Sequence, residues 1–258
     1  MIFETHAHYD DDCFEEDRDA LLRCLPEEGV GVVINSGASV ESTRDTIRLA
    51  REYAHVYAAV GVHPSEIEEL DEAFMDWMKE QAAWEKTVAI GEIGLDYYWD
   101  KEPEVQEKQR YWFGRQIELA RETGLPIIVH SRDAAADTMQ VMKEHHAGEI
   151  PGVIHCYSYS KEMAMEFIKM GYYIGVGGVV TFKNAKKLKE TVEAIPLERI
   201  LLETDCPYMA PEPYRGKRNS SLYLTYVRDK IAEIKGISSE EVERVTEENA
   251  RKLFAKVK

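Results

Sequence analysis

Short apolar runs rich in β-branched residues alternate with longer amphipathic segments along the whole chain, and this alternation leaves few folds open to it. The runs are continuously apolar rather than alternating, which is typical of β-strands covered on both faces. Parallel strands joined by helices are therefore expected. The eight expected strands are Ile2–Glu4, Val30–Asn35, Val56–Val62, Val88–Glu92, Ile127–His130, Val153–His155, Tyr172–Val176 and Ile200–Glu203.

The segments between the runs carry the three- and four-residue spacing of apolar side chains that one buried helix face requires. Ile47, Ala50 and Ala54 follow this spacing within residues 39–54. The last segment begins with Ser238 and Glu241, a capping-box pair that predicts the start of a helix. The spacing thus predicts helices between the strands and an additional helix at the C-terminus.

Eight strands alternating with helices in 258 residues fit a (β/α)8 TIM barrel, although a doubly wound open sheet gives the same order of elements. The unusual polar residues favour the barrel, because they fall at the carboxyl ends of many different strands. A closed barrel gathers such residues around one mouth, whereas an open sheet would spread them along an edge. We therefore expect an α/β (β/α)8 TIM barrel with an additional C-terminal helix. No linker-like tract divides residues 1–258, so a single domain is expected.

The charge balance limits the partners of this protein. The chain has 32 Lys and Arg against 48 Asp and Glu, a net charge of −16, which disfavours non-specific adhesion to nucleic acid or to an anionic membrane. A substrate that carries phosphate must therefore be attracted locally, for instance by metal ions. No apolar run approaches the roughly 20 residues of a membrane span, no signal peptide is visible, and the four cysteines lack CxxC spacing. These features predict a cytoplasmic protein with no membrane association, and no obligate protein partner is evident from the sequence.

Residue types that bind metals recur at the ends of the expected strands. The first strand leads into Thr5-His6-Ala7-His8, and two His at i and i+2 of an extended chain point the same way. Each such residue taken alone is more simply a buried structural side chain, but a shared metal site explains the whole set more economically. Besides His6 and His8, the set comprises His63, Glu92, His130, His155 and Asp205.

Imidazole and carboxylate ligands without thiolates suit zinc, manganese, magnesium or nickel. The set contains more ligands than one tetrahedral ion needs, and two ions bridged by a carboxylate would use it better. Two ions ~3.5–4 Å apart can activate a water and stabilise the attacking and leaving oxygens of a phosphodiester. Two divalent metal cations per chain are therefore expected, with the choice among these four metals open.

Six motifs follow one another along the chain: THAH, GVHP, AIGEIGLDY, VHSRDA, HCY and LLETDCPY. This ordered set resembles the TatD family of metal-dependent deoxyribonucleases, which belong to the amidohydrolase-like barrels, and the resemblance extends from Phe3 to Phe254. It implies that the chain hydrolyses DNA phosphodiester bonds and removes nucleotides from a strand end. The sequence departs from the family pattern after Asn219, where Ser220-Ser221 replaces an Asn-x-Pro-like signature.

The resemblance also implies a role for each ligand. His6, His8 and Asp205 would bind the first metal, and Glu92 would bridge the two metals. The remaining ligands of the second metal would be His130 and His155. Asp205 would also accept a proton from the attacking water, so the implied catalytic residues are Asp205 and Glu92. His63 would line the site as a phosphate contact or an outer group rather than as a metal ligand.

Basic residues near the strand ends are candidates for binding substrate phosphates. Arg132 follows the fifth strand, where a salt bridge to Asp133 is an equally simple structural role. The run Arg215-Gly216-Lys217-Arg218 follows the eighth strand, and loops in this position face the mouth of a barrel. We therefore expect substrate binding by His63, Arg132 and Arg215. A solvated helix face, with DNA steering as the second interpretation, is expected for Lys183, Lys186, Lys187 and Lys189.

Other interpretations stay open from the sequence. Tyr97, Tyr98 and Trp99 fit base stacking and packing on the barrel rim equally well. The same barrel and metals would also serve hydrolysis of another ester or amide, such as an aminoacyl-tRNA ester or a small-molecule amide, and the acidic charge favours that alternative. A metal-binding scaffold without catalysis is a third interpretation, which the presence of every ligand position together with Asp205 disfavours.

Overall fold

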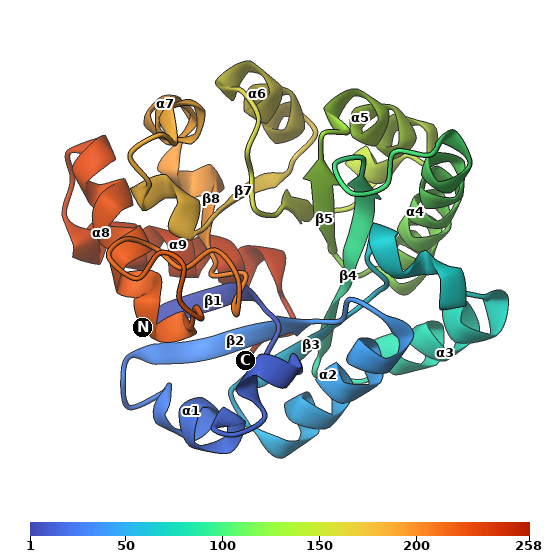
Figure 1. Cartoon of the computed structure of the whole chain (residues 1–258), viewed down its shortest axis with the longest axis horizontal. Coiled ribbons are helices and arrows are strands. Elements are labelled where there is room, and N and C mark those ends of the chain that lie inside the picture. The colour runs from blue at the N-terminus through green and yellow to red at the C-terminus, as the bar shows by residue number, and fades with distance from the viewer.

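The computed structural model describes residues 1–258, and its eight strands form one parallel sheet in sequence order from β1 to β8 (Figure 1). An open doubly wound sheet would instead reverse its strand order at a switch point. The (β/α)8 barrel expected from the alternation is therefore confirmed. The strands are β1 Ile2–Ala7, β2 Val30–Ser36, β3 Val56–Val60, β4 Thr87–Asp96, β5 Ile127–Arg132, β6 Gly152–Ile154, β7 Tyr173–Val176 and β8 Ile200–Leu202.

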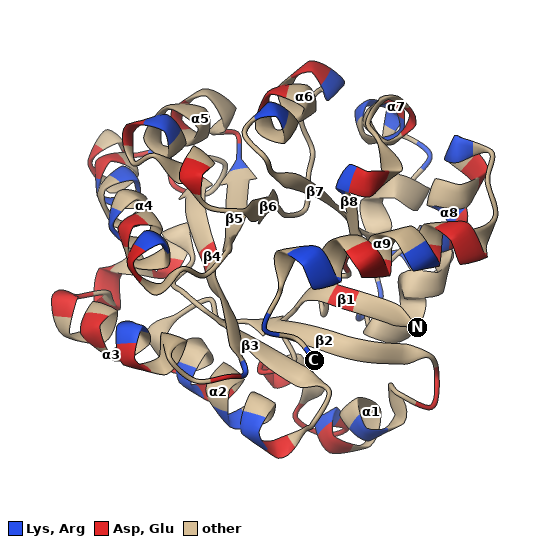
Figure 2. Ribbon diagram, turned by 180° about the vertical axis from the view of Figure 1, so that it is seen from behind, with Lys and Arg blue, Asp and Glu red and all other residues tan.

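The α-helices lie outside the strands and carry most of the charged residues, as Figure 2 shows. Side-chain caps fix several helix starts; Ser39 accepts from the Ser42 N–H and Ser160 from the Met163 N–H. The helices are α1 Arg18–Cys24, α2 Val40–Glu52, α3 Glu72–Ala82, α4 Pro103–Thr123, α5 Ala135–Glu144, α6 Lys161–Lys169, α7 Lys186–Ala194, α8 Leu224–Lys235 and α9 Ser239–Leu253. None of them combines the length and apolar character that crossing a membrane requires.

The sheet closes on itself between β1 and β8 through a few contacts at the carboxyl ends of the two strands. Ala7 and Cys206 form a parallel bridge, the Asp205 N–H donates to the His6 carbonyl at 3.0 Å, and the His8 N–H donates to the Cys206 carbonyl at 2.8 Å. The closure therefore involves the same short segments that carry three of the candidate ligands.

An apolar cluster fills the barrel interior at the amino ends of the strands, and α9 seals that end. Phe254 stacks on Phe3 of β1 with ring centroids 6.0 Å apart, and the Asn249 amide donates to the carbonyls of Leu197 and Ile200 just before and at the start of β8. Helix α9 accordingly lies behind the strands in Figure 1 and in front of them in Figure 2. The predicted additional C-terminal helix is confirmed, and it leaves only the opposite end of the barrel open.

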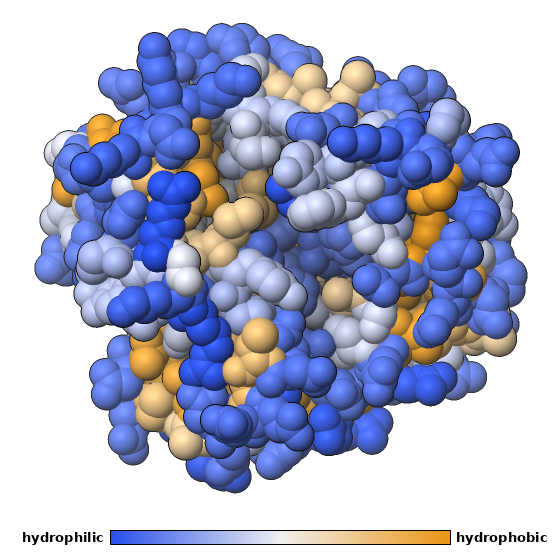
Figure 3. Space-filling view, viewed as in Figure 1, coloured by the Kyte–Doolittle hydropathy of each residue, from blue (hydrophilic) through white to orange (hydrophobic).

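Two strands end three or more residues later than the sequence predicted. β1 continues to Ala7 and β4 to Asp96, three and four residues beyond the expected ends. Both extensions contain polar residues, which the apolar-run criterion treats as the end of a strand. At the mouth of a barrel the inward-facing strand residues are polar. The hydrogen bonds between strands therefore continue beyond the point where the apolar residues end. Figure 3, drawn from the side of Figure 1, shows a hollow near the middle of this face with hydrophilic residues around it.

Candidate metal centre

One group of donor atoms lies where β1 meets β8. His6 and His8 lie on and just after β1, and their Nε2 atoms are 3.0 Å apart. Asp205 follows β8 in the left-handed region with φ of 60°, a conformation that Asp tolerates better than most residues. Its Oδ1 lies 3.6 Å from His6 Nε2 and 3.4 Å from His8 Nε2. Three donors from two distant segments thus face one another.

Glu92 of β4 connects this group to a second one. Its Oε2 lies 3.3 Å from His6 Nε2 and 3.5 Å from His8 Nε2, whereas its Oε1 lies 2.8 Å from His130 Nδ1 and 2.7 Å from His155 Nε2. His130 Nδ1 and His155 Nε2 are themselves 3.3 Å apart. The two oxygens of one buried carboxylate therefore face two separate sets of imidazole nitrogens.

The donor separations suit metal coordination. Neighbouring ligand atoms of a tetrahedral ion are about 3.4 Å apart when each bond is about 2.1 Å long. The separations of Glu92 Oε2 and Asp205 Oδ1 from the Nε2 atoms of His6 and His8, and of those two nitrogens from each other, span 3.0 to 3.6 Å. Buried imidazoles and carboxylates that converge in this way are the ligand types of first-row divalent ions, so the residues fit such cations.

Hydrogen bonds from outside each group fix the orientation of its rings. His8 Nδ1 lies 2.9 Å from the Ser36 carbonyl and must donate to it, which leaves Nε2 facing the other donors of the centre. His130 Nε2 lies 3.0 Å from Asp96 Oδ2 and donates to that carboxylate, which leaves Nδ1 toward Glu92. Such outer partners select the tautomer that binds a metal. Both rings are thus held ready to ligate.

Charge interactions within the centre shift the pKa values in opposite directions. Burial alone would raise the pKa of Glu92, but the nearby charges of His155 and His6 hold it well below its usual range. Burial lowers the pKa of His155, and the Glu92 charge overcomes this effect and raises it to about 9. Metal binding at His155 must therefore displace a proton at neutral pH.

Comparison with known proteins decides the family. A family model described as TatD related DNase matches residues 3–255. The chain belongs to the TatD-related DNase family of metal-dependent hydrolases. It is 44% identical over 254 residues to YabD of Bacillus subtilis strain 168, covering 98% of this chain and 99% of that protein. It is 35% identical to YcfH of Escherichia coli K12, covering 98% and 96%. Both relatives are described as uncharacterized metal-dependent hydrolases.

A solved structure agrees with this assignment. The crystal structure of YjjV, a TatD homologue from Escherichia coli K12, superimposes with a TM-score of 0.91 at 31% sequence identity and covers 98% of both chains. The whole barrel of this TatD-related protein, with α9, therefore has a counterpart in a solved family member. The likeness concerns the fold and the family.

His63 lies beside the second donor group of this TatD-related site. Its Nε2 is 3.9 Å from Glu92 Oε1, and its ring meets that of His130 edge-on with centroids 4.3 Å apart. His63 Nδ1 accepts the Ser65 N–H at 3.1 Å, so the neutral ring carries its proton on Nε2. Burial, with a contribution from His130, lowers the pKa of His63 to about 3. A neutral N–H donor pointing at the centre suits a substrate oxygen better than a metal.

Both arginines predicted to bind phosphate lie over aromatic rings and form no ion pairs. Arg132 makes no ion pair with Asp133; its guanidinium lies 4.0 Å from the ring centroid of Tyr98. Arg215 likewise lies over the ring of Phe182, at 4.3 Å, without an acidic partner. Both cations therefore keep their charge available for a phosphate.

Arg218, from the same basic run as Arg215, has a structural role instead. It forms a bidentate ion pair with Asp17, with distances of 2.8 and 2.6 Å, and donates to the Cys13 carbonyl. It thereby ties the loop after β8 to the loop after β1. Asn219 holds the same loop by donating to the carbonyls of Thr204 and Tyr208, so the absence of the family's proline leaves this loop well bonded.

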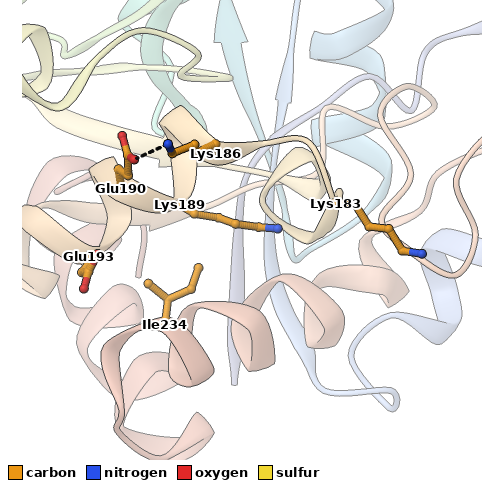
Figure 4. A pocket seen from close by; sticks show the side chains of 6 residues that line it. All are labelled: Lys183, Lys186, Lys189, Glu190, Glu193 and Ile234. Carbon is orange, nitrogen blue, oxygen red and sulfur yellow. Dashed lines mark ion pairs between the residues drawn. The ribbon is translucent and has the colours of Figure 1, made fainter.

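The lysines near α7 line a shallow surface pocket outside the barrel, together with Glu190, Glu193 and Ile234 (Figure 4). Lys186 pairs with Glu190 at 3.7 Å, and Lys189 donates to the Phe182 carbonyl at 2.6 Å. Lys183, Lys186 and Lys187 are exposed, as expected for a solvated helix face, whereas Lys189 is partly buried. The lysines around this pocket are Lys183, Lys186 and Lys189.

Sequence reasoning missed two carboxylates that contact the ligands. Asp96 holds His130, as described, and it went unrecognised because β4 was expected to end at Glu92. Glu203 accepts the Cys156 N–H, and its Oε1 lies 3.8 Å from His155 Nδ1. Burial raises the pKa of Glu203 to about 8. The alternation of side chains along β4, which places Asp96 four residues beyond Glu92 on the same face, was the available signal.

Asp96→Asn is expected to weaken metal binding at the second group by about 10- to 100-fold, because the ring of His130 loses the carboxylate that orients it. Titration of the metal-free protein with zinc, read by calorimetry, measures this change. Asp137→Asn is the control, since Asp137 pairs with Arg110 away from the centre. Equal zinc affinities for wild type and Asp96→Asn would contradict the orienting role of Asp96.

Proposed function

We propose that this protein is a deoxyribonuclease that hydrolyses DNA phosphodiester bonds with two divalent cations and removes nucleotides from a strand end. The observation that carries the proposal is the placement of Glu92, whose two oxygens face two different groups of imidazoles. One group would hold a cation through His6, His8 and Asp205. The other would hold a cation through His130 and His155, with Glu92 shared.

Bound in this way, two divalent cations supply Lewis-acid stabilisation of the phosphate and lower the pKa of a water. The protein's own contribution begins with Asp205. Burial would raise its pKa, but the hydrogen bond to His8 and the charge of His155 lower it, so the carboxylate is ionised at neutral pH. Besides holding the cation, the carboxylate can then accept the proton of the attacking water, which is the general-base role.

Other residues would bind and orient the substrate. The His63 Nε2–H faces the centre beside Glu92 and can donate to a non-bridging phosphate oxygen. Arg132 and Arg215 each keep an unpaired guanidinium for flanking phosphates. These cations compensate locally for the net charge of −16, which would otherwise repel a polyanion. The family description as DNases supports the same substrate.

Digestion of end-labelled DNA tests the proposal. The purified protein is first analysed for metal content and then incubated with a linear single-stranded oligonucleotide and with a covalently closed single-stranded circle. We expect stepwise shortening of the linear strand only, complete loss of cleavage with EDTA, and recovery when zinc, manganese, magnesium or nickel is added back. Cleavage of the circle at a comparable rate would show an endonuclease and would contradict the removal of nucleotides from an end.

The other outcomes distinguish the remaining functions. If DNA stays intact but an aminoacyl-tRNA ester or a small amide is hydrolysed, the protein is a hydrolase with a substrate other than DNA. Bound metal without turnover of any of these substrates would favour a metal-binding scaffold. Cleavage that EDTA does not affect would contradict a role for metal in the reaction.

A further inference from the structure

Two large aromatic side chains stand exposed in the turn after β4, at the open end of the barrel. Tyr98 is 42% exposed and Trp99 is 66% exposed, and their rings meet edge-to-face with centroids 4.8 Å apart. Tyr97, their neighbour, is engaged in packing instead, because its hydroxyl donates to Asp137 and accepts from Arg110. Tyr97 thus fits the rim-packing interpretation, whereas the exposed Tyr98 and Trp99 leave the base-stacking interpretation open.

A cation without an acidic partner completes this surface. The guanidinium of Arg132 lies 4.0 Å from the centroid of Tyr98 and 5.6 Å from that of Trp99. Arg132 follows His130 by two residues on β5, so both side chains project from the same face of the strand toward the mouth. The aromatic rings thus hold a positive charge beside a candidate metal ligand, and no carboxylate neutralises it.

One carboxylate connects the aromatic turn rigidly to the metal centre. Asp96 Oδ1 accepts the Tyr98 N–H at 3.0 Å and the Trp99 N–H at 3.1 Å. Its other oxygen accepts from His130 Nε2 at 3.0 Å. Three hydrogen bonds to a single buried side chain therefore tie the backbone from which the two rings project to a ligand of the second donor group.

We infer that Tyr98, Trp99 and Arg132 form a base-stacking subsite for the nucleotide that adjoins the scissile phosphodiester. Arg132 would contact the phosphate of that nucleotide, and the exposed face of Trp99 would stack on its base. Every nucleobase has a π-face, so stacking of this kind tolerates any sequence, and a base enclosed within a duplex has no free face to offer. The subsite thus takes an unpaired terminal base. This inference rests on the proposed nuclease function and adds a recognition element to it.

A comparison of base-bearing and abasic substrates tests the subsite. Trp99→Ala is assayed as the metal-loaded protein on two oligonucleotides that differ only in whether the terminal nucleotide has a base or a tetrahydrofuran abasic analogue. We expect kcat/KM on the base-bearing strand to fall about tenfold, with no loss on the abasic strand, and Trp99→Phe to restore most of the activity. Tyr111→Ala is the matched control, since Tyr111 is 54% exposed on α4 and touches none of these residues.

Binding separates a failed subsite from a failed nuclease assignment. Anisotropy of a labelled phosphorothioate oligonucleotide is measured with the same proteins. If wild type cleaves DNA, and Trp99→Ala lowers kcat/KM equally on the base-bearing and the abasic oligonucleotide or lowers it on neither, the subsite is overturned and the nuclease assignment stands. If wild type cleaves no DNA but Trp99→Ala weakens binding about tenfold, the subsite stands and the nuclease assignment fails. If neither cleavage nor binding occurs, both are overturned. A change in molecular mass in solution without an effect on DNA would show a protein interface and overturn the subsite.

Discussion

Glu92→Ala is expected to leave the protein with at most one tightly bound cation and to reduce phosphodiester hydrolysis by about a thousandfold or more. A metal ion contributes several kcal/mol of transition-state stabilisation, and each 1.36 kcal/mol corresponds to a factor of ten in rate. Glu92 is also the shared anion of the centre. The imidazoles with a nitrogen within 3.9 Å of one of its oxygens belong to His6, His8, His63, His130 and His155. Without Glu92, two cations would lie close together with no anion between them.

Elemental analysis after dialysis measures the number of metals per chain, and circular dichroism checks that the variant is folded. Glu92→Gln keeps the size of the side chain and removes only its charge, so it separates loss of metal from loss of packing. Glu118→Ala is the control for removing a glutamate beside a histidine, because Glu118 contacts His145 at 3.0 Å outside the barrel. Two cations per chain in folded Glu92→Ala would contradict the bridging role.

The barrel could be predicted from the sequence because its two periodicities are local. Continuous apolar runs predict strands covered on both faces, and the three- and four-residue spacing predicts the helices around them. Candidate ligands could then be found at strand ends, since parallel strands bring those ends together. The structure does bring the nitrogen and oxygen atoms of all six candidate ligands into two adjacent groups. Their roles in binding and catalysis stay a prediction.

Pairing between distant segments could not be predicted from such local patterns. Glu4 ends the first run expected from the sequence, and in the structure it lies fully buried within β1. Its carboxylate accepts from the Thr204 N–H, the Thr204 hydroxyl and the Ser221 hydroxyl, all about 200 residues later in the chain. Burial raises the pKa of Glu4 to about 7. The hydrogen bonds that join β1 to the segment after β8 become visible only in the closed barrel.

The same limit explains why the arginines could not be sorted beforehand. Arg215 and Arg218 are three residues apart in one basic run, yet Arg218 pairs with Asp17 and Arg215 pairs with no carboxylate. Arg132 precedes an aspartate in the sequence but contacts aromatic rings. Whether a cation is free to bind a phosphate depends on its neighbours in space, and the run of charges alone does not reveal them.

Asp205→Asn is expected to lower kcat by about 10²- to 10⁴-fold, the usual contribution of a general base, while most of the metal stays bound. Asparagine keeps the size of the side chain and an oxygen that can still face His6 and His8, but its amide cannot accept the water's proton. The remaining ligands, above all Glu92, are unchanged. The variant therefore separates the role of Asp205 as a proton acceptor from its role as a metal ligand.

Turnover and metal content measured on the same sample of Asp205→Asn decide between these roles. Asp45→Asn is the control, because Asp45 is a partly exposed carboxylate whose ion pair is with Arg48 of the same helix, α2. Loss of activity in proportion to loss of metal would show that Asp205 acts as a ligand only. Full activity with bound metal would mean that another group accepts the proton, and Glu203, a buried carboxylate just after β8, would be the next residue to replace. A deep loss of kcat with metal retained is the result that the ionised state of Asp205 predicts.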